Sequence, residues 1–454
     1  MEHSKHSAWH SVLLQYRKFQ LSLTPQQNLL FGFASYTLIG CALLSIPYAQ
    51  NQSVSSIDNL FVATSAISTT GLVTVSISDS YTWFGQFIVL GLIQIGGVGY
   101  MTFTSFVMLS LKSDLTHWHQ RVLNSEFSMP KGFKIQDFLR AVIVFTVCIE
   151  TLGAVALFIA FRAEGIEHNF AIWSSIFHSV SAFCTAGFGL YNNSFESFYG
   201  DVAVNGIISA LAILGSLGFI VVTDFWSRLT RKTRVISFTT KIILLTTAVL
   251  SALGTLVIYF LEPEVQHVPA STRLMVSFFQ SMTALTTVGF NTIPLSNFIL
   301  PVLLVIVLLM YVGASPSGTG GGMKSTTLVA LLAIMTSRIR GKSAVTFLGK
   351  AIPLDRMYVA TSTFILYASV IFGATFLLSV SENFSLQQIL FETTSAIGTV
   401  GLSLGITSSL STAGKIVLIV VMFIGRMGVI TFGLAILAKR KRAQHTTVEA
   451  DLAV

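Results

Sequence analysis

Long apolar runs alternate with short ones along the chain, and the same alternation occurs four times. In the first copy, an apolar run over residues 29–49 is followed by a short run over residues 59–68 and by a second long run over residues 83–111. As a helix, that short run would rise about 15 Å, half the thickness of a bilayer core. Each copy therefore predicts a spanning helix, a half-helix that enters the membrane without crossing it, and a second spanning helix.

The short runs end in a shared motif, which reads small–Ala–x–x–Thr–x–Gly followed by Leu or Phe. The motif glycines are separated by 116, 102 and 112 residues. A fixed period of about a hundred residues is typical of an array of equivalent units. A half-helix followed by an irregular, glycine-containing segment predicts a re-entrant loop. Such backbone is tolerated at membrane depth only where protein buries it or where it lines a watery cavity.

Four re-entrant loops around one axis can present a ring of carbonyl oxygens, which is how a cation selectivity filter is built. Glycine reaches positive φ without a Cβ penalty, so neighbouring carbonyls can turn toward the axis. Threonine adds a hydroxyl acceptor, and the partly negative end of each half-helix favours a cation. One such glycine would fit a helix-packing contact equally well, but four copies favour a filter. The predicted filter consists of Thr69, Thr70, Gly71, Leu72, Thr185, Ala186, Gly187, Phe188, Thr287, Val288, Gly289, Phe290, Thr399, Val400, Gly401 and Leu402.

The second long run of each copy also contains glycines three residues apart, which permit close helix contact or a bend. The third copy departs from this pattern, because residues 313–322 hold five glycines and a proline and cannot form a stable helix interior. An unwound loop at membrane depth is therefore predicted over residues 313–327, and its low local stability would let it move. A passive linker between two half-helices is the alternative. The residues singled out in this loop and in the last apolar run are Gly313, Pro316, Gly318, Gly320, Gly321, Gly322, Lys324 and Arg426.

A nucleotide-binding P-loop is disfavoured in this stretch, because the motif needs glycine at position 323 and the chain has Met323 there. Arg426 lies within the last long apolar run, and an intramembrane charge is costly enough to mark a functional site. It either has a functional role next to the unwound loop or is a structural arginine that pairs with carbonyls or with Glu150. Glu392 is interpreted as a charge that complements the start of the fourth half-helix.

Composition supports a membrane protein of many spans. Of the 454 residues, 53% are hydrophobic and 10% are charged, against about 25% charged in soluble proteins. The first 28 residues are too long and polar for a secretory signal, so the first apolar run is expected to be retained. Cys41, Cys148 and Cys184 show no metal or disulfide spacing, and no cofactor is expected.

The net charge of +8 is explained by topology rather than by nucleic acid, because 22 of the 27 Lys and Arg residues fall in segments on one side. By the positive-inside rule, both termini are expected in the cytoplasm. The predicted organisation is a cytoplasmic segment (1–28), repeat 1 (29–111), a loop (112–137), repeat 2 (138–227), a loop (228–240), repeat 3 (241–337), a loop (338–356), repeat 4 (357–438) and a cytoplasmic tail (439–454).

Four helix–loop–helix units with Thr–x–Gly at each filter resemble the Trk/Ktr/HKT superfamily of potassium transporters, most closely the bacterial Ktr-type membrane subunits. The resemblance covers about residues 29–442. It implies an all-α membrane protein of eight spanning helices and four half-helices around one pore, in the bacterial inner or plasma membrane. It also implies K⁺ as substrate and a gate beneath the filter, made by the loop residues singled out above together with Arg426, which would face the pore. In plant relatives, serine at the first filter position accompanies sodium preference, so Gly71 favours potassium.

The same resemblance implies a homodimer in membrane lipid, a cytoplasmic nucleotide-binding regulatory subunit of the KtrA type, and Na⁺ as an activator. A secondary transporter for another solute is the alternative, but it usually has two inverted repeats rather than four parallel ones. The filter mouth has no ring of four carboxylates, which disfavours a calcium or sodium channel. A membrane-embedded enzyme is disfavoured because no His–Asp–Ser set or carboxylate pair lies within the apolar runs.

Overall fold

A computed structural model describes residues 23–99, 135–229 and 236–437, and these residues are mostly helical. The expected unit of incoming helix, half-helix and outgoing helix occurs four times, which confirms the all-α repeat architecture. Residues 112–134 of the predicted loop 112–137, the tail 439–454 and most of the segment 1–28 lie outside the described residues, while residues 135–137 already belong to a helix.

Repeat 1 begins where Thr24 caps its first helix in a capping box with Gln27. Ser55 caps the half-helix by accepting a hydrogen bond from the Asp58 N–H. The second helix is described as far as Val98, so the expected continuation to residue 111 lies outside the described part. The elements of repeat 1 are α2 (Pro25–Leu44), η1 (Pro47–Ala49), α3 (Ser56–Ile67), α4 (Ile77–Ser80) and α5 (Trp83–Val98).

Repeat 2 follows the same plan, but its outgoing helix is not one straight spanning helix. It bends by 91° at Gly218, which has a φ of +86°. Glycine tolerates this left-handed conformation and commonly ends a helix. The elements of repeat 2 are α8 (Ile135–Ala163), α9 (His168–Phe183), η2 (Glu196–Phe198), α10 (Val202–Leu217) and α11 (Phe219–Leu229).

Repeat 3 contains the predicted interruption of its outgoing helix. The helix stops at Val312 and resumes at Ser325, so the unwound stretch is three residues shorter than the expected 313–327. The elements of repeat 3 are α12 (Phe238–Leu261), α13 (Pro263–His267), α14 (Ala270–Thr286), η3 (Leu295–Asn297), α15 (Leu300–Val312) and α16 (Ser325–Ile339).

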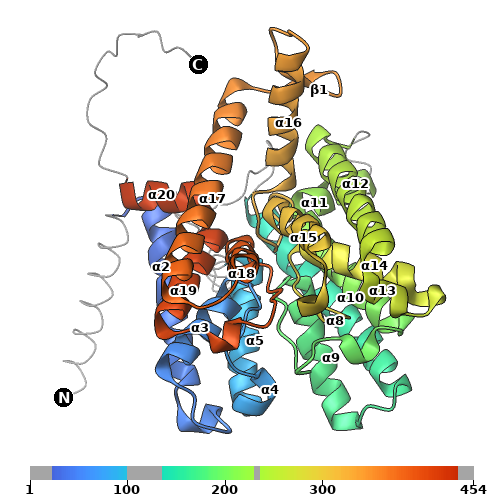
Figure 1. Cartoon of the computed structure of the whole chain (residues 1–454), viewed down its shortest axis with the longest axis vertical. Helices are drawn as coiled ribbons and strands as arrows, with labels where there is room; N and C mark the ends of the chain where they lie inside the picture. Colours follow the sequence, from blue (N-terminus) through green and yellow to red (C-terminus); the bar gives the residue numbers. More distant parts are fainter. Residues whose placement is uncertain (1–22, 100–134, 230–235, 438–454) are drawn as a thin grey trace.

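Repeat 4 ends in a second sharp bend, of 100°, at Gly428. A short antiparallel hairpin precedes the repeat and, with α16 and one end of α17, projects beyond the other helices in Figure 1. The elements are β1 (Thr346–Phe347), β2 (Lys350–Ala351), α17 (Leu354–Ser381), α18 (Leu386–Gly398), η4 (Thr407–Ser409), α19 (Thr412–Met427) and α20 (Val429–Leu437).

The helices have the length and composition of membrane spans. Within the described ranges, α2, α8, α12 and α17 are long and apolar enough to cross a bilayer, and counting each bent pair as one span adds two more. Large apolar side chains such as Ile159 and Phe372 are exposed on the outer surface. A contiguous apolar surface of this kind suits lipid rather than water. The chain is a multi-pass membrane protein.

The two ends of the chain come together in space. Figure 1 shows repeat 1, in blue, beside repeat 4, in orange and red, and α19 packs against α3. The four repeats therefore close around a common centre, where the half-helices converge.

Candidate functional site

The four motif glycines form a closed ring at this centre. Their φ angles are +91°, +68°, +82° and +93° for Gly71, Gly187, Gly289 and Gly401. A Cβ atom placed on any one of them would lie 3.0–3.3 Å from the Cα of the next. The same atom would overlap the carbonyl oxygen just before that next glycine, and the last glycine meets the first in this way. The repeats therefore surround one axis in chain order. The oxygens that approach the ring belong to Thr70, Ala186, Val288 and Val400.

The threonine of each motif ends its half-helix in the left-handed region. The φ angles are +52°, +50°, +61° and +48° for Thr69, Thr185, Thr287 and Thr399. In the first copy, the Thr70 N–H donates to Ser65 O at 2.9 Å and the Thr69 N–H donates to Ala66 O at 3.1 Å, a Schellman motif. Left-handed backbone is uncommon for a β-branched residue. From the sequence, positive φ is expected at the glycines alone, so these threonines were not anticipated.

The side chains that follow the glycines are buried in the protein and do not form the ring. Leu72, Phe188, Phe290 and Leu402 are at most 2% exposed. The structure thus brings the backbones of the four predicted Thr–x–Gly segments together. The Leu or Phe side chain that follows each glycine packs in the protein interior instead.

The predicted gate loop lies directly against the threonines. The Thr319 and Thr185 hydroxyls are 3.2 Å apart, and Thr319 Oγ1 also donates to Phe183 O at 3.0 Å. The Gly321 N–H donates to Thr287 Oγ1 at 3.0 Å. Thr319 was not predicted as a site residue, although its place within the glycine-rich stretch was a signal that could have identified it.

Arg426, in the last helical turn of α19, also contacts both the loop and a motif threonine. Its guanidinium donates to Thr69 Oγ1 at 3.0 Å and also to the carbonyls of Thr319 and Gly96. One side chain from repeat 4 therefore joins the motif of repeat 1 to the loop of repeat 3. Arg426 thus contacts the loop and pairs with carbonyls, while its place facing a pore stays a prediction. Glu150 instead accepts a hydrogen bond from Gln94 Nε2 at 3.2 Å.

Hydrogen bonds with Lys324 and with the end of α10 hold the loop in place. Lys324 Nζ donates to Gly320 O at 2.6 Å, so this ammonium caps a carbonyl of the loop itself. The Ser315 N–H donates to Ser216 O and the Thr319 N–H donates to Gly215 O, both at 3.1 Å. These two acceptors lie at the end of α10, next to its bend. The remaining gate residues form the turn itself: Gly313, Pro316, Gly318 and Gly322.

Glycines of the outgoing helices bring those helices onto the ends of the half-helices. A Cβ on Gly96, Gly215 or Gly425 would overlap the carbonyl oxygen of Ile67, Phe183 or Ile397 respectively. The glycines three residues apart in the outgoing helices therefore permit both close helix contact and a bend. In the second and fourth repeats, the first glycine permits close contact and the second permits the bend.

Two cavities lie on opposite sides of the ring and loop. The glycine-side cavity has a volume of about 520 Å³ and its lining includes the four motif glycines, Asp79 and Glu196. The loop-side cavity has a volume of about 430 Å³ and its lining includes Lys324, Arg356 and Arg426. One cavity thus carries carboxylates and the other carries cationic side chains.

Asp79 stays ionised at the glycine-side cavity. Asn192 Nδ2 donates to its carboxylate at 2.9 Å, and Ser76 adds a hydrogen bond. These hydrogen bonds hold the pKa of Asp79 below its ordinary value. Asn192 belongs to repeat 2, so the contact also joins the first two repeats.

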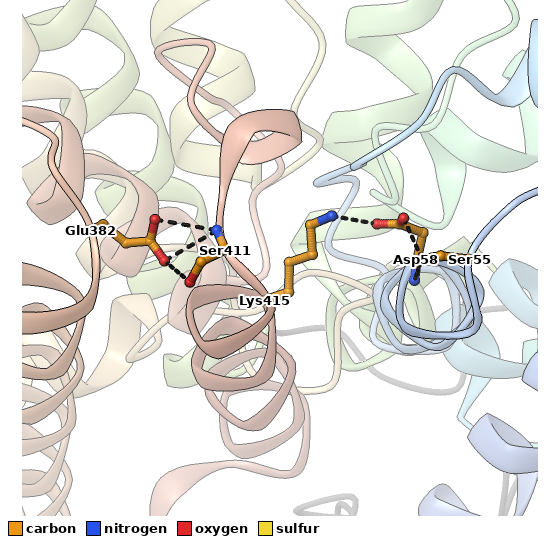
Figure 2. Close-up of polar contacts among 5 residues, drawn as sticks. All are labelled: Ser55, Asp58, Glu382, Ser411 and Lys415. Carbon is orange, nitrogen blue, oxygen red and sulfur yellow. Dashed lines mark hydrogen bonds and ion pairs between the residues drawn. The ribbon is translucent and has the colours of Figure 1, made fainter.

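Repeats 4 and 1 meet through an ion pair, shown in Figure 2. Lys415 Nζ lies 2.7 Å from Asp58 Oδ1, and their side chains are 13% and 14% exposed. On the other side of α19, the Glu382 carboxylate accepts from the Ser411 N–H at 3.2 Å. Ser411 in turn caps α19 through the Gly414 N–H. These contacts fix the N-terminal end of α19, the helix that carries Arg426.

The interpretation of Glu392 as a charge at the start of the fourth half-helix is wrong. The helix begins at Leu386, and Glu392 lies in its middle, fully buried. Its carboxylate accepts hydrogen bonds from Ser403 and from Thr407, which follow the motif glycine. The side chain therefore serves a local polar contact instead of the helix terminus.

Comparisons with known proteins agree in fold and sequence. A family model described as a cation transport protein, TrkH, matches residues 31–444. Ktr system potassium uptake protein B of Bacillus subtilis is 34% identical over 413 residues, 90% of this chain and 92% of that protein. Potassium/sodium uptake protein NtpJ of Enterococcus hirae is 33% identical over 437 residues, 94% and 96% of the two chains. The crystal structure of the potassium transporter TrkH from Vibrio parahaemolyticus has a similar fold, with a TM-score of 0.71 at 19% identity over 92% of this chain and 86% of that chain.

Proposed function

This chain belongs to the TrkH family of cation transport proteins, and on that premise we propose that it is the ion-translocating subunit of a potassium uptake system. Membership rests on a family match over residues 31–444 and confirms the resemblance inferred from the repeated motif. The observation that carries the proposal is the closed ring of four Thr–x–Gly segments. Relatives named as potassium uptake proteins support K⁺ as the substrate.

The proposed path starts in the glycine-side cavity, where Asp79 and Glu196 attract cations. A K⁺ ion then exchanges its water for the ring carbonyls, as in filters built from backbone oxygens. The carbonyls come from Thr70 and its three counterparts. Since the contribution is from the backbone, the x residue of the motif can vary without changing the ligand.

The gate loop blocks the next step in this conformation. Its contacts with Thr185 and Thr287, and the bridge from Arg426, lie directly beneath the ring. Conduction requires the loop to leave this position, which breaks those hydrogen bonds. The glycine content of the loop makes such a displacement feasible, and the cation of Arg426 opposes K⁺ passage until then.

The finer parts of the proposal are the assembly and its control. We propose a homodimer in the cell membrane with both termini in the cytoplasm, a KtrA-type cytoplasmic nucleotide-binding partner, and activation by Na⁺. The name of the Bacillus relative describes a Ktr system, and the name of the Enterococcus relative includes sodium. These two names support a multicomponent system and a role for sodium.

The test is net K⁺ uptake at low external K⁺, with and without Na⁺. The full chain and its partner are expressed in a bacterium that lacks its own potassium uptake. Wild type should restore selective K⁺ uptake. Gly289→Ser should weaken it, because φ is +82° there and a Cβ would overlap Val400 O. Absence of uptake by inserted wild type with its partner would contradict the proposal.

A further inference from the structure

Three of the four half-helices carry a polar side chain at the same place, nine residues before the motif glycine. The three residues are His178, Gln280 and Glu392, and each is 0% exposed. The first repeat has Val62 at this position. Burying a polar group is costly unless it is hydrogen-bonded, so the partners of these side chains indicate what they do.

His178 binds the chain that leaves the second motif. Its Nε2 accepts from the Leu190 N–H at 3.2 Å, and its Nδ1 lies 2.7 Å from Ser174 O. A carbonyl can only accept, so Nδ1 carries the proton and Nε2 is free to accept. The imidazole is therefore neutral. Its ring also stacks on Tyr191, with centroids 5.2 Å apart, which fixes its orientation.

Gln280 makes the corresponding contact in the third repeat. Its amide orientation is assigned from the hydrogen bonds available to it. With the oxygen toward the chain, Oε1 accepts from the Thr292 N–H at 2.9 Å and from the Ile293 N–H at 3.2 Å. A neutral amide thus replaces the neutral imidazole of the second repeat.

Glu392 does the same in the fourth repeat with a carboxyl group. It accepts from the Ser403 hydroxyl and, at 3.2 Å, from the Thr407 hydroxyl. The backbone of Leu404 also stabilises this carboxylate electrostatically. The common feature of the three side chains is an acceptor, since their charge and shape differ.

The receiving segment is equivalent in all three repeats. Leu190 and Thr292 each lie three residues after the motif glycine, and Ser403 and Thr407 lie two and six residues after it. Each contact therefore runs from a half-helix to the chain just beyond the ring. We propose that His178, Gln280 and Glu392 are positioning residues that hold the carbonyl ring at the spacing that prefers K⁺ to Na⁺.

This inference rests on the proposed function and deepens it. Without the acceptor, the backbone N–H behind the ring would be buried and unpaired. The segment would then shift toward another hydrogen-bond partner. The ring carbonyls attached to it would be free to move inward and coordinate a smaller ion such as Na⁺. Discrimination should fall while ion binding itself persists, because the carbonyls remain.

Glutamine is the conservative substitution at the two other positions. Glutamine already makes the contact in repeat 3, so Glu392→Gln and His178→Gln keep an acceptor oxygen. Glu392→Leu and Gln280→Leu remove it at similar volume. Thr394→Val and Thr283→Val are matched controls on the same half-helices, because both hydroxyls are buried and have no hydrogen-bond partner in the part of the chain that the structure describes.

The experiment measures thermal unfolding of the purified full chain over a range of K⁺ or Na⁺ concentrations. An ion that binds the folded protein raises the unfolding temperature, so no transport is needed. The quantity compared is the ratio of the half-stabilising Na⁺ and K⁺ concentrations. We expect this ratio to fall about fivefold in each leucine variant. The glutamine variants and the valine controls should stay within about twofold of wild type.

Leucine variants that fold, bind ions and keep the wild-type ratio would overturn the inference while leaving the proposed function intact. A wild-type chain that shows no preference for K⁺ would instead count against the proposed function. If Glu392→Leu does not fold, Ser403→Ala and Thr407→Val weaken the same contact from its other end. An unchanged ratio in that pair would also overturn the role of Glu392.

Discussion

The Lys415 ammonium lies 2.7 Å from the Asp58 carboxylate and joins the last repeat to the first across 357 residues of chain. Consecutive repeats are also linked by peptide bonds, whereas repeats 4 and 1 are held only by packing and polar contacts. We therefore expect Lys415→Met to lower the stability by about 1–2 kcal/mol, as for a partly buried ion pair. Thermal unfolding measures this loss.

The control for this ion pair is the double variant with Asp58→Asn. Removing both charges leaves no unpaired group, so the double variant should be more stable than the sum of the single losses predicts. Strictly additive losses would mean that the two charges do not interact.

Arg426→Gln should favour the open position of the gate loop. The substitution removes the cation and the bridge from Thr69 to Thr319 O. Losing about 2 kcal/mol of closed-state contacts shifts the equilibrium roughly thirtyfold. Initial K⁺ uptake should rise and depend less on Na⁺ or the partner. Arg356→Gln is the matched control, because Arg356 lines the same cavity and has no described hydrogen bond to the loop. Equal effects of both substitutions would point to cavity charge alone.

Gly425→Ala should reduce the yield of folded protein. Its Cβ would overlap Ile397 O, and overpacking of this kind costs about 1–3 kcal/mol or more. Gly206→Ala, on the outgoing helix of repeat 2, meets nothing within 4 Å and should be neutral or slightly stabilising. Size-exclusion profiles and unfolding temperatures distinguish the two. Similar behaviour of both variants would contradict the close approach.

Asp79→Asn should raise the half-saturating K⁺ concentration about twofold at low ionic strength, and less at high salt. The pKa of Asp79 is below its ordinary value, so its carboxylate stays charged from pH 8 down to about pH 5. Over that range the wild type should show no loss of affinity from this group. Uptake kinetics at two salt concentrations test both statements. A salt-independent change would indicate altered loop structure instead.

The architecture could be predicted from the sequence because it depends on long periodic features. Four copies of one motif, with apolar runs of fixed order, predicted the repeats and the half-helices. The glycine-rich stretch predicted the interruption after Val312, since no helix interior tolerates that composition.

The details of the site depend on contacts between distant segments, which local patterns do not contain. The left-handed Thr69 follows from a Schellman motif, and sequence reasoning assigns that conformation to glycine first. Glu392 was misplaced because its acceptor role appears only when the half-helix is packed against residues 403–407. The roles of the filter and gate residues in transport stay predictions.

The ring of carbonyl oxygens is built by one polypeptide from four unequal quarters. A homotetrameric pore receives every substitution on all four sides at once, whereas Gly289→Ser here would alter a single side. A single inherited substitution therefore changes one quarter of the ring and leaves the other three unchanged. The first quarter, which has Val62 in place of a polar residue, is already different from the others. On the proposed function, selectivity in such a chain is a graded trait on which selection can act one side at a time.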